Sequence, residues 1–231
     1  MNQDHTHTHT HTHTHTHTHA PAPGDPDERY TQATWDERYG ASAQIWSGKP
    51  NAQLVAEVSG LPAGEALDIG AGEGGDAVWL ARQGWQVTAL DVSPVALAKV
   101  RANADQAGVG ERVRTLQHDL ISDAALPGTF DLVTAHFWHP PIPRRPEIAS
   151  VLGAAVRPGG TLLVVGHHPG DMVDREDPHG HAELAYTPEQ VAALLEEEDW
   201  DLRVVESRTR TSTRSEGPAV LTDSVVVAVR R

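Results

Sequence analysis

The sequence predicts an α/β protein with a doubly wound, seven-stranded sheet, mostly parallel, that ends in a C-terminal antiparallel hairpin. From residue 66 onward, strand-like and helix-like segments alternate, as they do when helices connect parallel strands. A glycine-rich turn, residues 70–75, directly follows the first strand. The last two strand-like segments, 202–206 and 224–229, have no helix between them. We therefore expect them to pair antiparallel, joined by the polar stretch 207–223.

The first 29 residues differ from the rest of the chain and are expected to form a disordered tail. Histidine stands at every odd position from His5 to His19, alternating with threonine, so nothing apolar is available to bury. Alternating imidazoles are expected to capture divalent metals weakly, although such a tract is also typical of an engineered affinity tag. Residues 30–231 remain as one domain that is long enough to bury a full core.

Composition and charge exclude several classes of protein. The 231 residues carry a formal net charge of −14, which repels phosphate backbones and argues against nucleic acid as a partner. There is no cysteine, which excludes disulfide scaffolds, cysteine-ligated metals and thiol nucleophiles. The apolar runs, such as 225–229, are too short to cross a membrane, and no signal-peptide pattern stands near the start. We expect a cytoplasmic protein with no membrane partner.

Residues 30–62 are expected to form two helices at the entry to the domain. Aromatic residues at helical spacing open this segment: Tyr30, Trp35, Tyr39 and Trp46. The turn 47–51 ends the first helix, and Gly60 closes the second.

The remaining elements follow in order. Strands are predicted at 66–69, 85–91, 113–118, 130–136 and 161–166, before the final pair. Helices are predicted at 76–83, 94–107, 147–156 and 188–197. Ser93 and Pro94 form a typical helix start, with an N-cap serine and proline at the first helical position. The polar stretch 207–223, with Arg208, Arg210 and Arg214, is expected to be a mobile, solvated loop.

Candidate ligand-binding residues gather at the carboxyl ends of the first strands, where ligands bind in open α/β sheets. Gly70, Gly72 and Gly75 fit the G-x-G-x-x-G spacing of dinucleotide sites. Gly74 instead completes the G-x-G-x-G spacing of nucleoside-binding methyltransferases. Asp91 stands at the end of the second strand, where a carboxylate accepts from ribose hydroxyls in either class. These residues leave the class of cofactor open.

Two carboxylates distinguish a dinucleotide from the nucleoside cofactor of a methyltransferase. Asp68, two residues before Gly70, gains little beside a pyrophosphate but stabilises a ligand that carries ammonium and sulfonium groups. Asp119 follows the third strand, where it can accept from the amine of adenine. At these positions the chain resembles the class I S-adenosylmethionine-dependent methyltransferases, which have a Rossmann-like fold. The resemblance covers about residues 30–231 and rests on four segments: 67–74, 89–94, 118–120 and 157–161.

The resemblance implies S-adenosylmethionine as the cofactor and a small molecule as the methyl acceptor. The implied cofactor-binding residues are Asp68, Gly70, Gly72, Gly74, Asp91, Val92, Asp119 and Leu120. Residues 30–62 are similar to the lid of the small-molecule branch, which includes thiopurine S-methyltransferase and tellurite-resistance methyltransferases. This implies acceptor or lid roles for four aromatic residues, which can otherwise pack the core: Trp35, Tyr39, Trp46 and Trp138. Residues 136–141 depart from the Asn-Pro-Pro-Tyr pattern of nucleic-acid base methyltransferases.

Histidines are the candidate general bases, because methyl transfer needs a base only when the acceptor keeps its proton at neutral pH. A thiol or other easily ionised chalcogen acceptor needs none. Four histidines follow the fourth and fifth strands, namely His136, His139, His167 and His168. We take His136 and His167 as catalytic candidates, the alternative being loop histidines that bond backbone carbonyls. Convergence with His179 and His181 on a metal is conceivable, but we expect no metal in the folded domain.

Three other functions remain open from the sequence. A nicotinamide-dependent oxidoreductase would use the same glycine turn. A non-catalytic protein would bind a nucleoside or a metal without turnover. A macromolecular methyltransferase would dock a protein, which the acidic charge does not disfavour.

Overall fold

The structure, a computed structural model, describes residues 28–171, 182–214 and 217–231. Its strands are β1 Glu65–Ile69, β2 Gln86–Asp91, β3 Val113–Gln117, β4 Phe130–His136, β5 Val156–His167, β6 Trp200–Arg214 and β7 Gly217–Arg230. Its α-helices are α1 Gln32–Gly40, α2 Ala52–Val58, α3 Gly75–Arg82, α4 Pro94–Gln106, α5 Arg145–Ala154 and α6 Pro188–Ala192. Short 3-10 helices lie at Glu28–Tyr30, Gly110–Arg112, Ile142–Arg144, Pro169–Asp171 and Ala182–Leu184. Residues 1–27 of the predicted tail lie outside the described part of the chain.

The strands form one seven-stranded sheet in the order β3-β2-β1-β4-β5-β7-β6, which confirms the predicted fold class. The first five strands are parallel, whereas β7 runs antiparallel to both β5 and β6. The chain order reverses between β1 and β4, so the carboxyl ends of these two strands open the crevice in which such sheets bind ligands.

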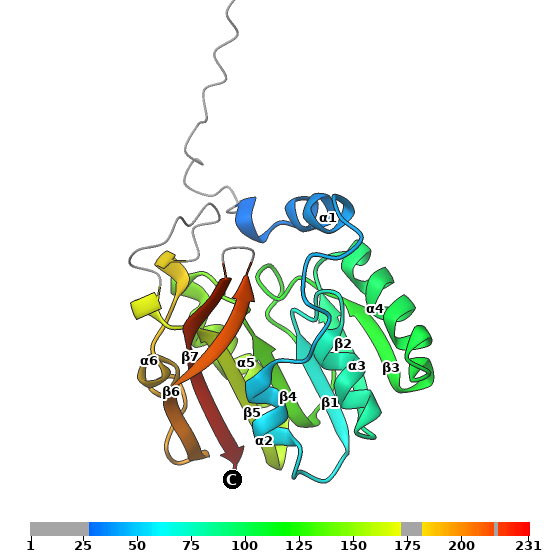
Figure 1. Cartoon of the computed structure of the whole chain (residues 1–231). Helices are drawn as coiled ribbons and strands as arrows, with labels where there is room; N and C mark the ends of the chain where they lie inside the picture. Colours follow the sequence, from blue (N-terminus) through cyan, green and yellow to red (C-terminus); the bar gives the residue numbers. More distant parts are fainter. Residues whose placement is uncertain (1–27, 172–181, 215–216) are drawn as a thin grey trace, which may run out of the picture.

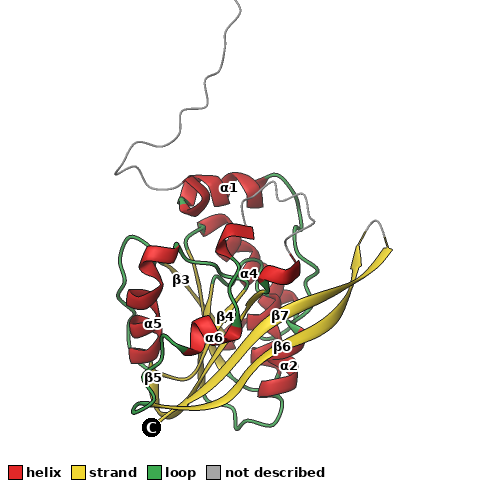
Figure 2. Cartoon of the chain, turned by 90° about the vertical axis from the view of Figure 1, so that its left-hand side faces the viewer, coloured by secondary structure: helices red, strands yellow, loops and turns green. Residues whose placement is uncertain are grey.

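Helices cover both faces of the sheet (Figures 1 and 2). On one face α2, α3 and α4 pack through Leu54, Leu80 and Val100 against sheet residues such as Leu132. On the other face α5 and the segment after α6 pack through Ile148, Leu152 and Leu195. α1 lies across the carboxyl edge of the parallel strands (Figure 1). Among the residues that the structure describes, no helix is long and apolar enough to cross a membrane.

The C-terminal hairpin is much longer than the sequence predicted. β6 and β7 pair continuously from Trp200 and Arg230 to Arg214 and Gly217, and they extend past the other strands in Figure 2. The expectation that 207–223 is a mobile loop is therefore wrong for its described residues. Their polar side chains find partners within the sheet and on α2, so polarity there does not indicate a loop.

Three predicted boundaries also change. α6 ends at Ala192 and is followed by turns, whereas a helix to residue 197 was expected. β5 is longer than expected, because the turn 157–160 is itself included in the strand that ends at His167. α5 begins at Arg145 and ends at Ala154, two residues earlier at each end than expected.

Candidate cofactor and acceptor site

The turn after β1 has a backbone that only glycine adopts readily. Gly70, Gly72 and Gly74 have positive φ angles of 66°, 54° and 85°. A Cβ atom at Gly70 would lie 2.9 Å from Trp138 Cδ1, and one at Gly72 would lie 3.0 Å from the Tyr39 hydroxyl. The three glycines of the G-x-G-x-G spacing are therefore each required by backbone conformation, two of them also by the aromatic side chains that cover the turn.

Asp68 is buried beneath this turn with half of its carboxylate unpaired. Its Oδ1 accepts a hydrogen bond of 3.0 Å from Thr134 Oγ1 on β4. Its Oδ2 is buried and has no hydrogen-bond partner among the described residues. Burial, reinforced by the nearby Asp76 carboxylate, raises the pKa of Asp68 to about 7. An unpaired buried carboxylate oxygen is costly for the fold, and it is well suited to meet a cationic ligand.

Asp91 ends β2 beside the same turn. Its Oδ2 accepts from the Gly72 backbone N–H at 2.9 Å, and its Oδ1 accepts from the Ser93 N–H at 2.9 Å. Burial raises the pKa of Asp91, although both hydrogen bonds act in the opposite direction. The carboxylate is thus held in one orientation at the turn, and Val92 follows it half-buried.

The predicted adenine segment lies on the neighbouring strand. The His118 backbone N–H donates to the Asp91 carbonyl, which ties the end of β3 to the end of β2. Asp119 Oδ1 accepts from the N–H groups of Ile121 and Ser122, so this carboxylate orders its own loop. Leu120 is a buried core residue. The end of β3 is thus joined to the glycine turn through Asp91, while Leu120 packs the core.

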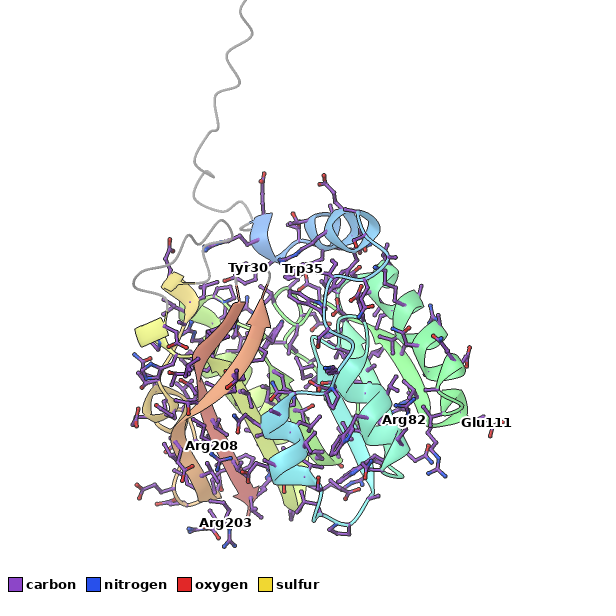
Figure 3. All side chains as sticks on the ribbon, in the orientation of Figure 1. Tyr30, Trp35, Arg82, Glu111, Arg203 and Arg208 are labelled. Carbon is purple, nitrogen blue, oxygen red and sulfur yellow. The ribbon has the colours of Figure 1, made fainter. Side chains whose placement is uncertain are left out.

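The lid aromatics lie over the glycine turn. Trp46 Nε1 donates to the Tyr39 hydroxyl at 3.3 Å, and both side chains face Gly72. Tyr39 is buried, whereas Trp46 is 44% exposed. Trp35, labelled in Figure 3, stacks on Tyr39 with ring centroids 5.7 Å apart. Tyr39 and Trp46 thus cover the site directly, and Trp35 supports Tyr39.

Glu73, which the sequence reasoning missed, fastens the lid to the turn. Its buried carboxylate accepts from the backbone N–H groups of Ile45 and Trp46 and from Lys99 Nζ, the last at 2.9 Å. Although burial opposes it, these donors hold the pKa of Glu73 below its usual value. The signal in the sequence was a charged residue inside a glycine turn, which needs a partner when buried.

Of the two catalytic candidates, His136 has the geometry of an oriented base. Its Nδ1 lies 2.8 Å from Asp76 Oδ2, and its Nε2 is buried with no hydrogen-bond partner among the described residues. Burial lowers the pKa of His136, but the carboxylates of Asp76, Asp68 and Asp223 together outweigh burial, so the net shift is upward. Asp76 is fixed in turn by the Asn51 N–H, which donates to its Oδ1.

His139 and His167 lie in a cluster of rings with Phe137, the residue that follows His136. His167 stacks on Phe137 with centroids 4.6 Å apart and on His139 at 5.2 Å. His139 Nε2 accepts from the His167 backbone N–H, and His168 Nδ1 accepts from the Gly170 N–H. His179 and His181 lie outside the described residues.

Trp138 packs against Gly70 and the hydrophobic core on the α5 side of the sheet.

Asp68, Asp76 and His136 each place one ligand atom within 4.8 Å of the others, an arrangement able to hold a cation. Since Asp68 lies directly before the glycine turn, the ammonium group of a nucleoside cofactor fits this position as well as a metal does.

The fold and the site together define a nucleoside-binding α/β domain with a covered glycine turn. Residues 66–160 match the family model described as "Methyltransferase domain". The matched segment runs from β1 into β5 and includes the glycine turn, Asp91 and Asp119, so this part of the chain is similar to a methyltransferase domain.

Individual relatives agree with this class but differ in their acceptors. The release factor glutamine methyltransferase of Chlorobaculum tepidum is 39% identical over 103 residues, which are 38% of this chain and 35% of that protein. The ubiquinone biosynthesis O-methyltransferase of Xanthomonas campestris pv. campestris is 34% identical over 112 residues, 48% of this chain and 46% of that protein. The chain therefore matches less than half the length of either relative.

A solved structure shares nearly the whole fold. It is described as "Conversion of a Disulfide Bond into a Thioacetal Group during Echinomycin Biosynthesis" and superposes with a TM-score of 0.68 at 22% identity. The match covers 86% of this chain and 91% of that one. At this identity the likeness establishes the fold alone.

Proposed function

We propose that the protein transfers a methyl group from S-adenosylmethionine to the sulfur, oxygen or other chalcogen atom of a small-molecule acceptor. The observation that carries the proposal is the buried, unpaired Oδ2 of Asp68 at the foot of the glycine turn. A carboxylate in that state disfavours a pyrophosphate and favours a cation, and S-adenosylmethionine carries both an ammonium and a sulfonium group.

The residues of the site fit this cofactor. The glycine turn provides a surface without side chains, and Asp68 Oδ2 would accept from the amino group of the cofactor. Asp91 would accept from the ribose hydroxyls and Asp119 from the adenine amine, as the family resemblance implies. When bound, the cofactor supplies a methyl group on a sulfonium, whose transfer depends on an in-line approach by the acceptor. Tyr39 and Trp46 would exclude water from above.

His136 would act on the acceptor proton. Asp76 holds Nδ1, so Nε2 is left to accept a proton from a hydroxyl acceptor. A thiol with a pKa near ~8.5 or lower ionises without this help. The O-methyltransferase relative supports a hydroxyl acceptor. The lid resemblance supports the small-molecule branch in either case.

A panel of acceptors tests the proposal by release of S-adenosylhomocysteine. It contains small thiols, selenite, tellurite, catechols, small amines and oligonucleotides. We expect turnover with a thiol, selenium, tellurium or hydroxyl compound. Turnover confined to amines or oligonucleotides would overturn the proposed acceptor class. His136→Asn, with His168→Asn as its control, should cost about 10²–10⁴ in rate for a hydroxyl and little for an ionised thiol.

A further inference from the structure

A buried pair of opposite charges lies on β6 and β7, away from the glycine turn. Asp223 is fully buried, and both of its carboxylate oxygens accept from Arg210 Nε, at 2.9 and 2.8 Å. Gln53 Nε2 on α2 donates to Asp223 Oδ2 at 3.4 Å. These contacts fix the Arg210 side chain in one place, because its Nε is held by a carboxylate that cannot move into solvent.

Two nitrogens of the Arg210 guanidinium, Nη1 and Nη2, donate to no residue in the described part of the chain. The side chain is 23% exposed. Arg208, two residues earlier on the same strand, differs in this respect. Its Nη1 pairs with Glu57 and its Nε pairs with Glu206, beside α2 (Figure 3). Arg208 therefore pairs with carboxylates through both Nε and Nη1, whereas Arg210 does so through Nε alone.

Strand register places Asp223, the partner of Arg210, on the same face of the sheet as the proposed base. His136 pairs with Val165, and His167, two residues further along β5, pairs with Asp223. Since alternate residues of a strand share a face, His136, His167 and Asp223 project from the same face of the sheet. The Arg210 guanidinium lies over the ring of Phe137, 5.1 Å from its centroid.

Phe137 also marks this region as unusual. It is the only non-glycine residue among those described with a positive φ, 52°. A bulky residue in that conformation is strained and is held there by its surroundings, a feature that gathers at ligand sites. Its ring is stacked on His167 and faces Arg210, so an aromatic surface and a fixed cation stand together next to His136.

We propose that Arg210 binds a carboxylate group of the methyl acceptor and thereby selects small acidic acceptors. This inference rests on the proposed function and names the substrate class for the same site. A guanidinium presents parallel N–H groups that match the two oxygens of a carboxylate. Asp68 and Asp76 on β1 and α3 repel an anion, so the acidic end of the acceptor is directed to Arg210. The cationic cofactor would bind at the Asp68 carboxylate, at the opposite end of the site.

Matched pairs of acid and amide test this inference in the full-length protein. S-adenosylhomocysteine is titrated first by calorimetry, and its binding reports on the proposed function alone. The saturated protein is then titrated with 4-mercaptobenzoate and 4-hydroxybenzoate, and with the amide of each. We expect each acid to bind about tenfold to a hundredfold more tightly than its amide.

Variants of Arg210 and Arg208 test which arginine binds the carboxylate. Arg210→Gln should abolish the preference for the acid and leave S-adenosylhomocysteine affinity unchanged, while Arg208→Gln should keep the preference. Because Arg210→Gln leaves Asp223 buried without a cation, the double variant Arg210→Gln/Asp223→Asn provides a second version without either charge. Equal binding of acid and amide by the saturated wild-type protein, no binding of either acid, or a preference that survives in a folded Arg210 variant would overturn the inference. Failure to bind S-adenosylhomocysteine would instead overturn the proposed function.

Discussion

Replacing Asp68 by Asn should stabilise the protein without cofactor and weaken its binding of S-adenosylmethionine. The pKa of Asp68 is about 7 in the fold and 3.8 without the influence of the fold. The folded state therefore holds a proton that the unfolded chain has lost, so stability is full below about pH 4 and falls as the pH rises to about 7. A difference of about three pKa units corresponds to about 4 kcal/mol at most.

Thermal unfolding checks the first half of this prediction. At pH 8, Asp68→Asn should raise the melting temperature by several degrees, since about 1 kcal/mol corresponds to roughly 2–4 °C in a chain of this size. At pH 5 the gain should be smaller, because Asp68 already carries its proton. Glu111→Gln, which removes an exposed carboxylate (Figure 3), serves as the control and should change little at either pH.

Calorimetry checks the second half. Binding a cation should expel the proton from Asp68, so the affinity of the wild-type protein for S-adenosylmethionine should weaken by about tenfold per pH unit below the pKa of Asp68. In Asp68→Asn this proton release should disappear, and affinity at pH 8 should fall by about tenfold to a hundredfold. A variant that is less stable at pH 8 and binds the cofactor as tightly as the wild type would refute the reasoning.

Three further predictions concern the same site and the tail. Asp91→Ala should weaken S-adenosylmethionine binding by about tenfold to a hundredfold, and unchanged affinity by calorimetry would remove Asp91 from the site. Gly72→Val should abolish cofactor binding and loosen the lid, because φ is 54° and the new side chain meets Tyr39; normal binding would contradict this. Deleting residues 1–27 should leave the melting temperature and cofactor affinity unchanged while nickel retention falls, and a loss of affinity would make the tail part of the lid.

The parts of the fold that the sequence predicted well depend on short-range patterns. The glycine turn follows β1 directly, and its glycines adopt the left-handed backbone that their spacing indicates. Ser93 begins α4 as an N-cap, with its hydroxyl accepting from the Ala96 N–H at 3.1 Å. Each of these signals lies within a few residues of the feature that it predicts, so no long-range information was needed.

The parts that could not be predicted depend on pairs brought together by the fold. Asp76 and His136 are 60 residues apart in sequence, and Glu73 and Lys99 are 26 apart. Only the packing of α3 on β4, and of α4 on the glycine turn, makes them partners. Arg210 was assigned to a solvated loop because polar residues surround it, whereas sheet register places it against Asp223. Polarity alone does not distinguish a loop from a strand whose polar side chains are paired.

A crystal structure of the full chain with S-adenosylhomocysteine would test the central claim most directly. We expect the ligand on the glycine turn beneath Tyr39 and Trp46, with its amino nitrogen about 2.7–3.2 Å from Asp68 Oδ2 and its ribose hydroxyls on Asp91. A ligand bound elsewhere, or one whose amino group leaves Asp68 Oδ2 unpaired, would contradict the assignment of this carboxylate as the cofactor's anchor.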